Sequence, residues 1–170
     1  MLGEALATRL FVKPAILLLA DADIARLLAE PKPEIDPRSL VAKLEPGPDG
    51  HRRIAISVRG DSDSQFRLAI RQSTQDPDNF SVILAYVSMG GATINLRRHN
   101  GPSHPHRNKI EGSDVDFVCH VHSATQRYQE RGFDAEGFAE ATDDFADLGG
   151  ALRAMLQAAA FRPPAQATML

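Results

Sequence analysis

Between residues 51 and 71 apolar and polar residues alternate with a period of two, and this pattern restricts the segment to β-strands. Apolar residues occupy every second position on both sides of the turn sequence GDSDS, at Ile54, Ile56, Val58, Phe66, Leu68 and Ile70. Residues two apart share one face of a strand, whereas in a helix they do not. The segment therefore predicts an antiparallel hairpin with one apolar face.

The rest of the chain predicts three further strands and three helices. Apolar runs between turn signals predict strands at 80–87, 92–99 and 115–122. Helical spacing of apolar residues predicts helices at 21–30, where Asp21 is the expected cap, at 134–147, and from 148 to a stop before Pro163. We expect an α+β fold: an antiparallel meander of about five strands with a short N-terminal helix and two C-terminal helices.

The N-terminal third differs in composition from the rest of the chain. Residues 31–50 contain five prolines and two glycines, which predicts a connector with limited structure. We therefore divide the chain into an N-terminal helix and proline-rich connector, 1–50, and a sheet with C-terminal helices, 51–162. At 170 residues the two parts are expected to form one compact domain.

Composition and charge limit the protein's class and location. A hydrophobic content of 43% and a charged content of 24% are typical of a globular protein. The single cysteine, Cys119, excludes an intrachain disulfide and indicates a reducing, cytoplasmic location; it is expected to face the core and to be inert. The apolar run 15–20 is too short to cross a bilayer, so no membrane partner is expected.

Charge is distributed unevenly along the sequence. Residues 51–109 contain nine basic and four acidic side chains, a net charge of +5. Residues 110–148 contain two basic and ten acidic side chains, a net charge of −8. The basic segment could bind phosphate and the acidic segment would repel it, although the two segments could instead neutralise each other across the fold. Binding of a nucleic acid would therefore be confined to one face.

Five of the six histidines fall between His99 and His122. Imidazole exchanges a proton near neutral pH and is the commonest metal ligand in proteins. His120 and His122 lie two apart in a predicted strand and so share a face. If Ile94 and Leu96 face the core, simple alternation in their strand places Arg97 and His99 on the same outer face as that pair.

A face of arginine and histidine suits a phosphodiester. Arginine presents a planar fork of donors to phosphate, and two imidazoles can serve as general base and general acid without a metal. We therefore predict a ribonuclease site for RNA, with His120, His122 and His104 as acid-base groups. The predicted phosphate ligands are Arg97, Arg98, Asn100, Arg67 and Arg71.

Two alternatives use the same features differently. His120 and His122, with His104 or His106, could ligate zinc in a hydrolase, because three imidazoles leave an open fourth position. The chain could instead be a binding or inhibitor module that presents its sheet, or the acidic helix expected at 134–147, to a protein partner. The acidic segment is also compatible with a solvated helix face, and the arginines with a soluble sheet surface.

The segment from Leu96 to His104, LRRHNGPSH, followed by Phe117 and by HVH at 120–122, resembles the signature of TumE-like toxins of bacterial toxin-antitoxin systems. The resemblance implies a small α+β protein that poisons its host by cutting RNA and is silenced by a cognate antitoxin. It carries that family's site over to Arg97, Asn100, His104, His120 and His122. The chain departs from the family pattern at His99, where an acidic residue is usual, and at Ser103, which replaces a histidine.

Overall fold

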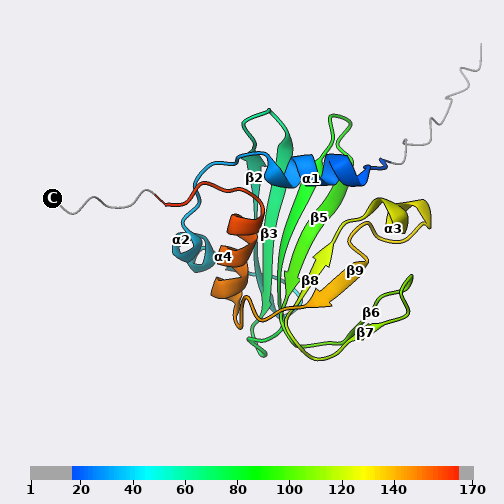
Figure 1. Cartoon of the computed structure of the whole chain (residues 1–170). Coiled ribbons are helices and arrows are strands. Elements are labelled where there is room, and N and C mark those ends of the chain that lie inside the picture. Colours follow the sequence, from blue (N-terminus) through cyan, green and yellow to red (C-terminus); the bar gives the residue numbers. More distant parts are fainter. Residues whose placement is uncertain (1–16, 165–170) are drawn as a thin grey trace, which may run out of the picture.

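A computed structural model describes residues 17–164 and shows an α+β fold built on one antiparallel sheet (Figure 1). The sheet has seven strands in the order β1-β2-β3-β4-β5-β8-β9, and β6 and β7 pair as a separate two-stranded sheet. The strands are β1 (Glu45–Pro46), β2 (His51–Arg59), β3 (Gln65–Ser73), β4 (Phe80–Val87), β5 (Thr93–Asn100), β6 (His106–Arg107), β7 (Asp114–Val115), β8 (His120–Ser123) and β9 (Phe138–Ala141). The predicted meander is therefore confirmed.

Helices cover one face of this sheet. The helices are α1 (Asp21–Ala29), α2 (Pro37–Ala42), α3 (Gln126–Glu130) and α4 (Leu148–Ala158). In Figure 1, α1 crosses the strands near one end, α4 lies beside the strands next to α2, and α3 lies apart from α2 and α4. Contacts join α4 to β4 and β5. Leu68, Leu84 and Met155 are completely or almost completely buried between α4 and the sheet. Burial of this apolar face is the main favourable term in folding.

Lys32 links the C-terminal end of α1 to the C-terminal end of α4. Its side chain is fully buried, and Nζ donates to the carbonyl oxygens of Leu27, Glu30 and Ala159 at 2.8–2.9 Å. Burial lowers the pKa of Lys32 to about 8, although the nearby Glu30 carboxylate opposes this shift. The ammonium satisfies carbonyls that the helix ends leave without partners, so it has a structural role.

Three local predictions were wrong. The segment predicted as a helix at 134–147 contains strand β9, which pairs with β8 and supplies the partners that the β8 edge needs. The connector contains α2, whose N-terminal amides are capped by Asp36. Asp21 does not cap α1; its carboxylate accepts from the backbone N–H of Gln126 instead.

The strand predicted at 115–122 is also divided. Val115 belongs to β7 and pairs with His106, whereas β8 begins only at His120. Phe117, between them, is exposed, while Cys119 packs in the core as expected. Burial raises the pKa of the Cys119 thiol, which keeps it protonated and unreactive.

A β-bulge in β5 reverses the faces of the residues after it. Ala85 opposes Asn95 but its neighbour Leu84 opposes Arg97, so β5 contains one extra residue at this point. The extra residue shifts the alternation by one position. Arg97 and His99 therefore lie on the helix-covered face, and Arg98 and Asn100 lie on the other side, which we call the open face.

Within residues 17–164 no helix is long and apolar enough to span a membrane. Part of the apolar run 15–20 and most of the C-terminal segment after Pro163 lie outside the described residues.

Candidate functional site

Four imidazoles meet on the open face of the sheet, at the β8 end. The ring centroids are 4.5 Å apart for His106 and His122, 5.0 Å for His120 and His122, and 5.5 Å for His104 and His120. His104 lies in the loop after β5 and His106 in β6, so the β6–β7 hairpin brings them onto β8. We call these four residues the histidine cluster.

The two histidines of β8 are held by backbone carbonyls. Nδ1 of His120 lies 2.8 Å from the carbonyl oxygen of Val118, and Nδ1 of His122 lies 3.0 Å from that of Glu136. A carbonyl only accepts, so each Nδ1 carries the hydrogen and each Nε2 is left as an acceptor in the neutral ring. The tautomer of both rings is therefore fixed by the fold.

Asn100 joins these two acceptors. Its side-chain Nδ2 lies 3.3 Å from Nε2 of His120 and 3.2 Å from Nε2 of His122, so one amide can donate a hydrogen to each ring. The amide oxygen accepts from the hydroxyl of Ser81 at 2.8 Å, which orients the group. His120 is fully buried and His122 is 6% exposed. Every ring nitrogen of the β8 pair thus has a partner inside the protein.

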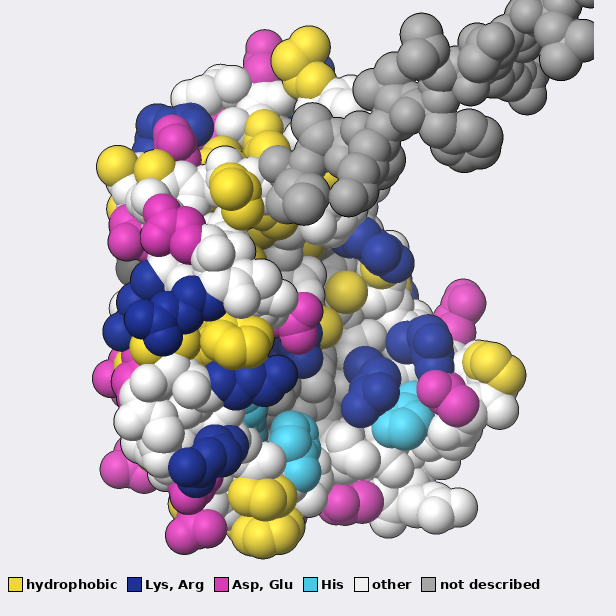
Figure 2. Space-filling view, turned by 90° about the vertical axis from the view of Figure 1, so that its right-hand side faces the viewer, with side chains coloured by type: hydrophobic (Ala, Val, Ile, Leu, Met, Phe, Trp, Pro, Cys, Tyr) yellow, Lys and Arg dark blue, Asp and Glu magenta, His cyan; other side chains and the backbone are white. Residues whose placement is uncertain are grey.

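His104 and His106 are held by fewer hydrogen bonds than the β8 pair. Nε2 of His106 donates to the carbonyl of Gly137 at 2.9 Å, and Nδ1 of His104 lies 3.1 Å from the Ser103 hydroxyl. Nδ1 of His106 and Nε2 of His104 have no hydrogen-bond partner among residues 17–164. His104 is exposed and His106 half-buried, and Figure 2 shows histidine side chains at the surface with lysine and arginine side chains around them.

Burial and neighbouring rings disfavour positive charge on three members of the cluster, His104, His120 and His122. Burial lowers the pKa of His122 to about 3, and the neighbouring His106 and His120 act in the same direction. Burial likewise lowers the pKa of His120, with smaller effects of the same sign from His104 and His106, although its bond to Val118 opposes them. The pKa of His104 is lowered by partial desolvation of its ring, where it packs against His120, and then by His106. These three rings are therefore neutral at pH 7.

Arg98 stands beside the cluster, opposite His122 in the register of β5 and β8. Glu136 holds Arg98 through an ion pair to Nη2 and also accepts from Nδ2 of Asn95 at 2.6 Å. The Nε atom of Arg98 has no partner within the described part of the chain. The Glu136 contact thus positions the guanidinium without using all of its donors.

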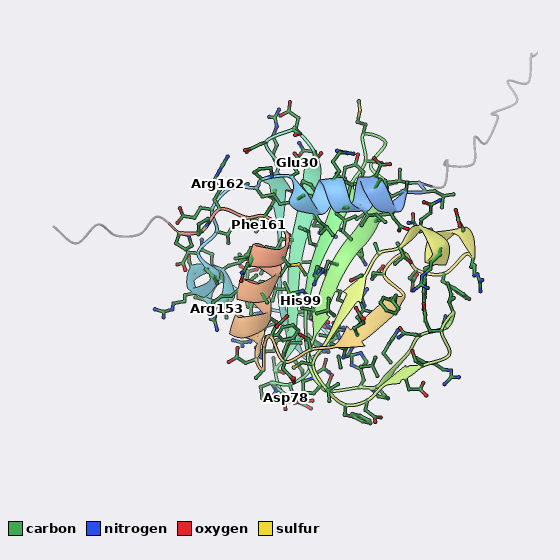
Figure 3. All side chains as sticks on the ribbon, viewed as in Figure 1. Glu30, Asp78, His99, Arg153, Phe161 and Arg162 are labelled. Carbon is green, nitrogen blue, oxygen red and sulfur yellow. The ribbon has the colours of Figure 1, made fainter. Side chains whose placement is uncertain are left out.

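Arg97 and His99 are separated from the cluster by the sheet, which corrects their predicted placement. His99 stacks on Phe145 with ring centroids 5.1 Å apart, and its Nδ1 donates to the Ala151 carbonyl of α4; Figure 3 shows it beside that helix. Nε of Arg97 donates to Nε2 of His99. Arg97 therefore cannot hold a phosphate that also contacts the histidine cluster, and the bulge is the physical reason.

The other predicted phosphate ligands lie on the open face. Arg71 is opposite Ser81, which is opposite Asn100. Arg67 is four residues from Arg71 in β3 and therefore lies on the same face. Sequence reasoning missed Ser81, Asn95 and Glu136. Glu136 fell in a segment predicted as helix, and only the pairing of β9 with β8 brings it to Arg98.

The geometry does not support the zinc alternative. In the part of the chain that the structure describes, no three histidine, cysteine, aspartate or glutamate side chains are arranged to hold a metal ion. Three of the four imidazoles use a ring nitrogen for a backbone carbonyl, and the remaining nitrogens of the β8 pair face Asn100 rather than a shared empty centre.

No family model matches this chain, and no curated protein or solved structure matches it significantly.

Proposed function

We propose that the histidine cluster is the site of a metal-independent ribonuclease that cleaves RNA by transfer of its own 2′-hydroxyl. The observation that supports this most is the contrast within the cluster: two imidazoles keep one unpartnered ring nitrogen each, and both pack against a fully hydrogen-bonded pair. Such an arrangement offers two proton-transfer groups beside arginine.

The reaction requires one proton to be taken and one to be given. The 2′-oxygen attacks the adjacent phosphorus while its proton passes to Nε2 of His104. The lowered pKa of His104 favours the neutral ring, and Nε2 serves as the base in the tautomer in which Nδ1 donates to the Ser103 hydroxyl. The P–O5′ bond breaks, and the departing oxygen receives a proton from Nδ1 of His106, which acts as the general acid. The products are a 2′,3′-cyclic phosphate and a 5′-hydroxyl, and exchange with solvent restores both rings.

In this proposal His120 and His122 are positioning residues. Their ring nitrogens are occupied by the Val118 and Glu136 carbonyls and by Asn100, so neither has a free lone pair for a substrate proton. They hold the hairpin rings by contact at 4.5–6.4 Å between centroids. Arg98, fixed by Glu136, would stabilise the charge that develops on the phosphate oxygens.

The test is cleavage of a single-stranded RNA, followed by detection of the 2′,3′-cyclic phosphate end. We expect His104→Ala and His106→Ala each to lower the rate by roughly a hundredfold to ten-thousandfold, the usual contribution of a general acid or base. His51→Ala removes a histidine outside the cluster and should leave the rate unchanged. A chelator should have no effect.

Cleavage that survives in both His104→Ala and His106→Ala, with the circular dichroism spectrum of the wild type, would contradict this assignment. The resemblance to TumE-like toxins adds a cellular expectation: expression should stop growth, and a cognate antitoxin should relieve the arrest. Growth arrest by the His104→Ala protein would show that the toxicity does not depend on the proposed cleavage reaction.

A further inference from the structure

A groove on the open face lies next to the histidine cluster. It has a volume of about 620 Å³ and crosses β2, β3 and β4. Its floor contains the small and apolar side chains Ala55, Ala69 and Ile83, which lie in one row across the three strands. The walls carry the longer charged side chains Arg53, Arg67, Arg71, Lys43 and Glu45.

The groove has an excess of positive charge. Arg67 and Arg71 are exposed, and neither makes a hydrogen bond or ion pair with another residue in the range 17–164. Arg53 pairs with Asp49 through Nη2, so its charge is partly compensated. Glu45 is the one carboxylate that lines the groove within that described range. Two unpaired guanidiniums in a recess attract an anion with several charges, because each offers a planar pair of donors.

The groove continues into the candidate site. Arg71, Ser81, Asn100 and His120 are opposite one another on four successive strands, β3, β4, β5 and β8. Neighbouring strands are about 4.8 Å apart, so Arg71 lies roughly 10 Å from Asn100. Arg71 also contributes to the lowered pKa of His104, after burial and His106. A chain molecule bound in the groove would therefore lead to the cluster.

We propose that this groove binds an unpaired stretch of the RNA strand whose phosphate is cleaved at the histidine cluster. The inference rests on the proposed function and names its substrate as single-stranded. Phosphates would contact Arg67 and Arg71, and bases would lie on the apolar floor at Ala69 and Ile83. A duplex hides the faces of its bases inside the stack, so it would leave this floor without a partner, whereas single strands combine backbone charge with exposed base faces.

The test is binding of a fluorescent 2′-O-methyl RNA, which lacks the attacking hydroxyl and cannot be cleaved by the proposed reaction. The double variant Arg67→Ala/Arg71→Ala should bind at least tenfold more weakly. Its affinity should also depend less on salt, with the slope of log affinity against log salt reduced by about 1.4, because each lost phosphate contact to a single strand accounts for about 0.7.

The matched control is Arg52→Ala/Arg59→Ala, which removes two arginines that do not line the groove. Arg52 adjoins Arg53 in sequence but donates to Gln72 on the other face of the hairpin. This variant should bind within about twofold of the wild type. A duplex of the same length should bind more weakly than the single strand.

Equal loss of binding in the groove and control variants, or unchanged binding in the groove variant, would overturn the groove assignment. Equal affinity for duplex and single strand would overturn the choice of an unpaired strand. The proposed chemistry is tested separately: loss of cleavage in His104→Ala with unchanged binding of the 2′-O-methyl RNA supports both proposals. Specific binding in the groove without cleavage by the wild type would retain the groove and reject the ribonuclease.

Discussion

The two faces of the sheet use the same side chain in opposite ways. On the helix-covered face, His99 is 2% exposed, stacks on Phe145 and bonds through both ring nitrogens to Ala151 and Arg97. On the open face four imidazoles contact one another, and two of them keep an unpartnered nitrogen in the described structure. A histidine with both nitrogens satisfied in a core stabilises the fold, whereas a crowded group with free nitrogens is a candidate for proton transfer.

The largest difference between the two faces is expected when His99 is removed. His99→Ala leaves a cavity beside Phe145 and leaves the Ala151 carbonyl without its donor, so we expect the free energy of unfolding to fall by about 2–4 kcal/mol. His104→Ala, in the exposed loop between β5 and β6, should change this free energy by less than about 0.5 kcal/mol. Urea denaturation of both variants measures the difference. Similar losses for the two would show that the faces are not distinct.

Acid should weaken the fold through the buried histidines. In the folded protein the pKa of His99 is about 4 and that of His122 about 3, both lowered chiefly by burial, against about 6.5 in the unfolded chain. Below pH 6.5 the unfolded state therefore binds more protons, and stability is lost as the pH falls toward 4. Each group contributes a slope of up to about 1.4 kcal/mol per pH unit.

Urea midpoints at pH 7, 5.5 and 4 measure this dependence. The variant His99→Leu removes one of the titrating groups, so its profile should be flatter than that of the wild type over the same range. A wild-type midpoint that stays constant from pH 6.5 to 4 would contradict the burial of neutral imidazoles on both faces.

A smaller effect is expected at Asn100, which joins the open-face pair. Asn100→Ala leaves two buried Nε2 atoms without a donor, and we expect a loss of about 1–3 kcal/mol. The pKa values of His120 and His122 should rise, because the amide favours the neutral rings. NMR titration of the imidazoles measures this shift. Ser81→Ala removes only the hydrogen bond that orients the Asn100 amide and should raise these pKa values less. An equal rise in both variants would show that the Asn100 donors do not cause it.

The smallest effect is expected at the turn between β2 and β3. Arg59 and Asp63 form an ion pair whose side chains are 67% and 74% exposed. Solvent screens such pairs, so Arg59→Ala should change stability by less than about 0.5 kcal/mol and leave cleavage of RNA unaltered. A larger loss of cleavage would extend the functional surface beyond the groove and the histidine cluster.

Local patterns predicted most of the sheet. Alternation in the segment 51–71 indicated a hairpin with one apolar face, and helical spacing indicated α1 and α4. In the structure Ile56 and Leu68 pair on that face. These elements are predictable because their side-chain periods match the pleat or the helical turn with no interruption. The segment 134–147 failed because apolar residues at Phe138 and Ala141 fit a helix by spacing, while the unpaired edge of β8 required a strand there.

The antiparallel meander and the shared face of His120 and His122 follow from local sequence, because both result from a period of two within a strand. The residues that join this pair depend on how distant strands are paired. One extra residue in β5 moved His99 and Arg97 to the helix-covered face and turned Asn100 and Arg98 toward the cluster. A bulge is set by packing between strands that are distant in sequence, so no local pattern in β5 indicates it.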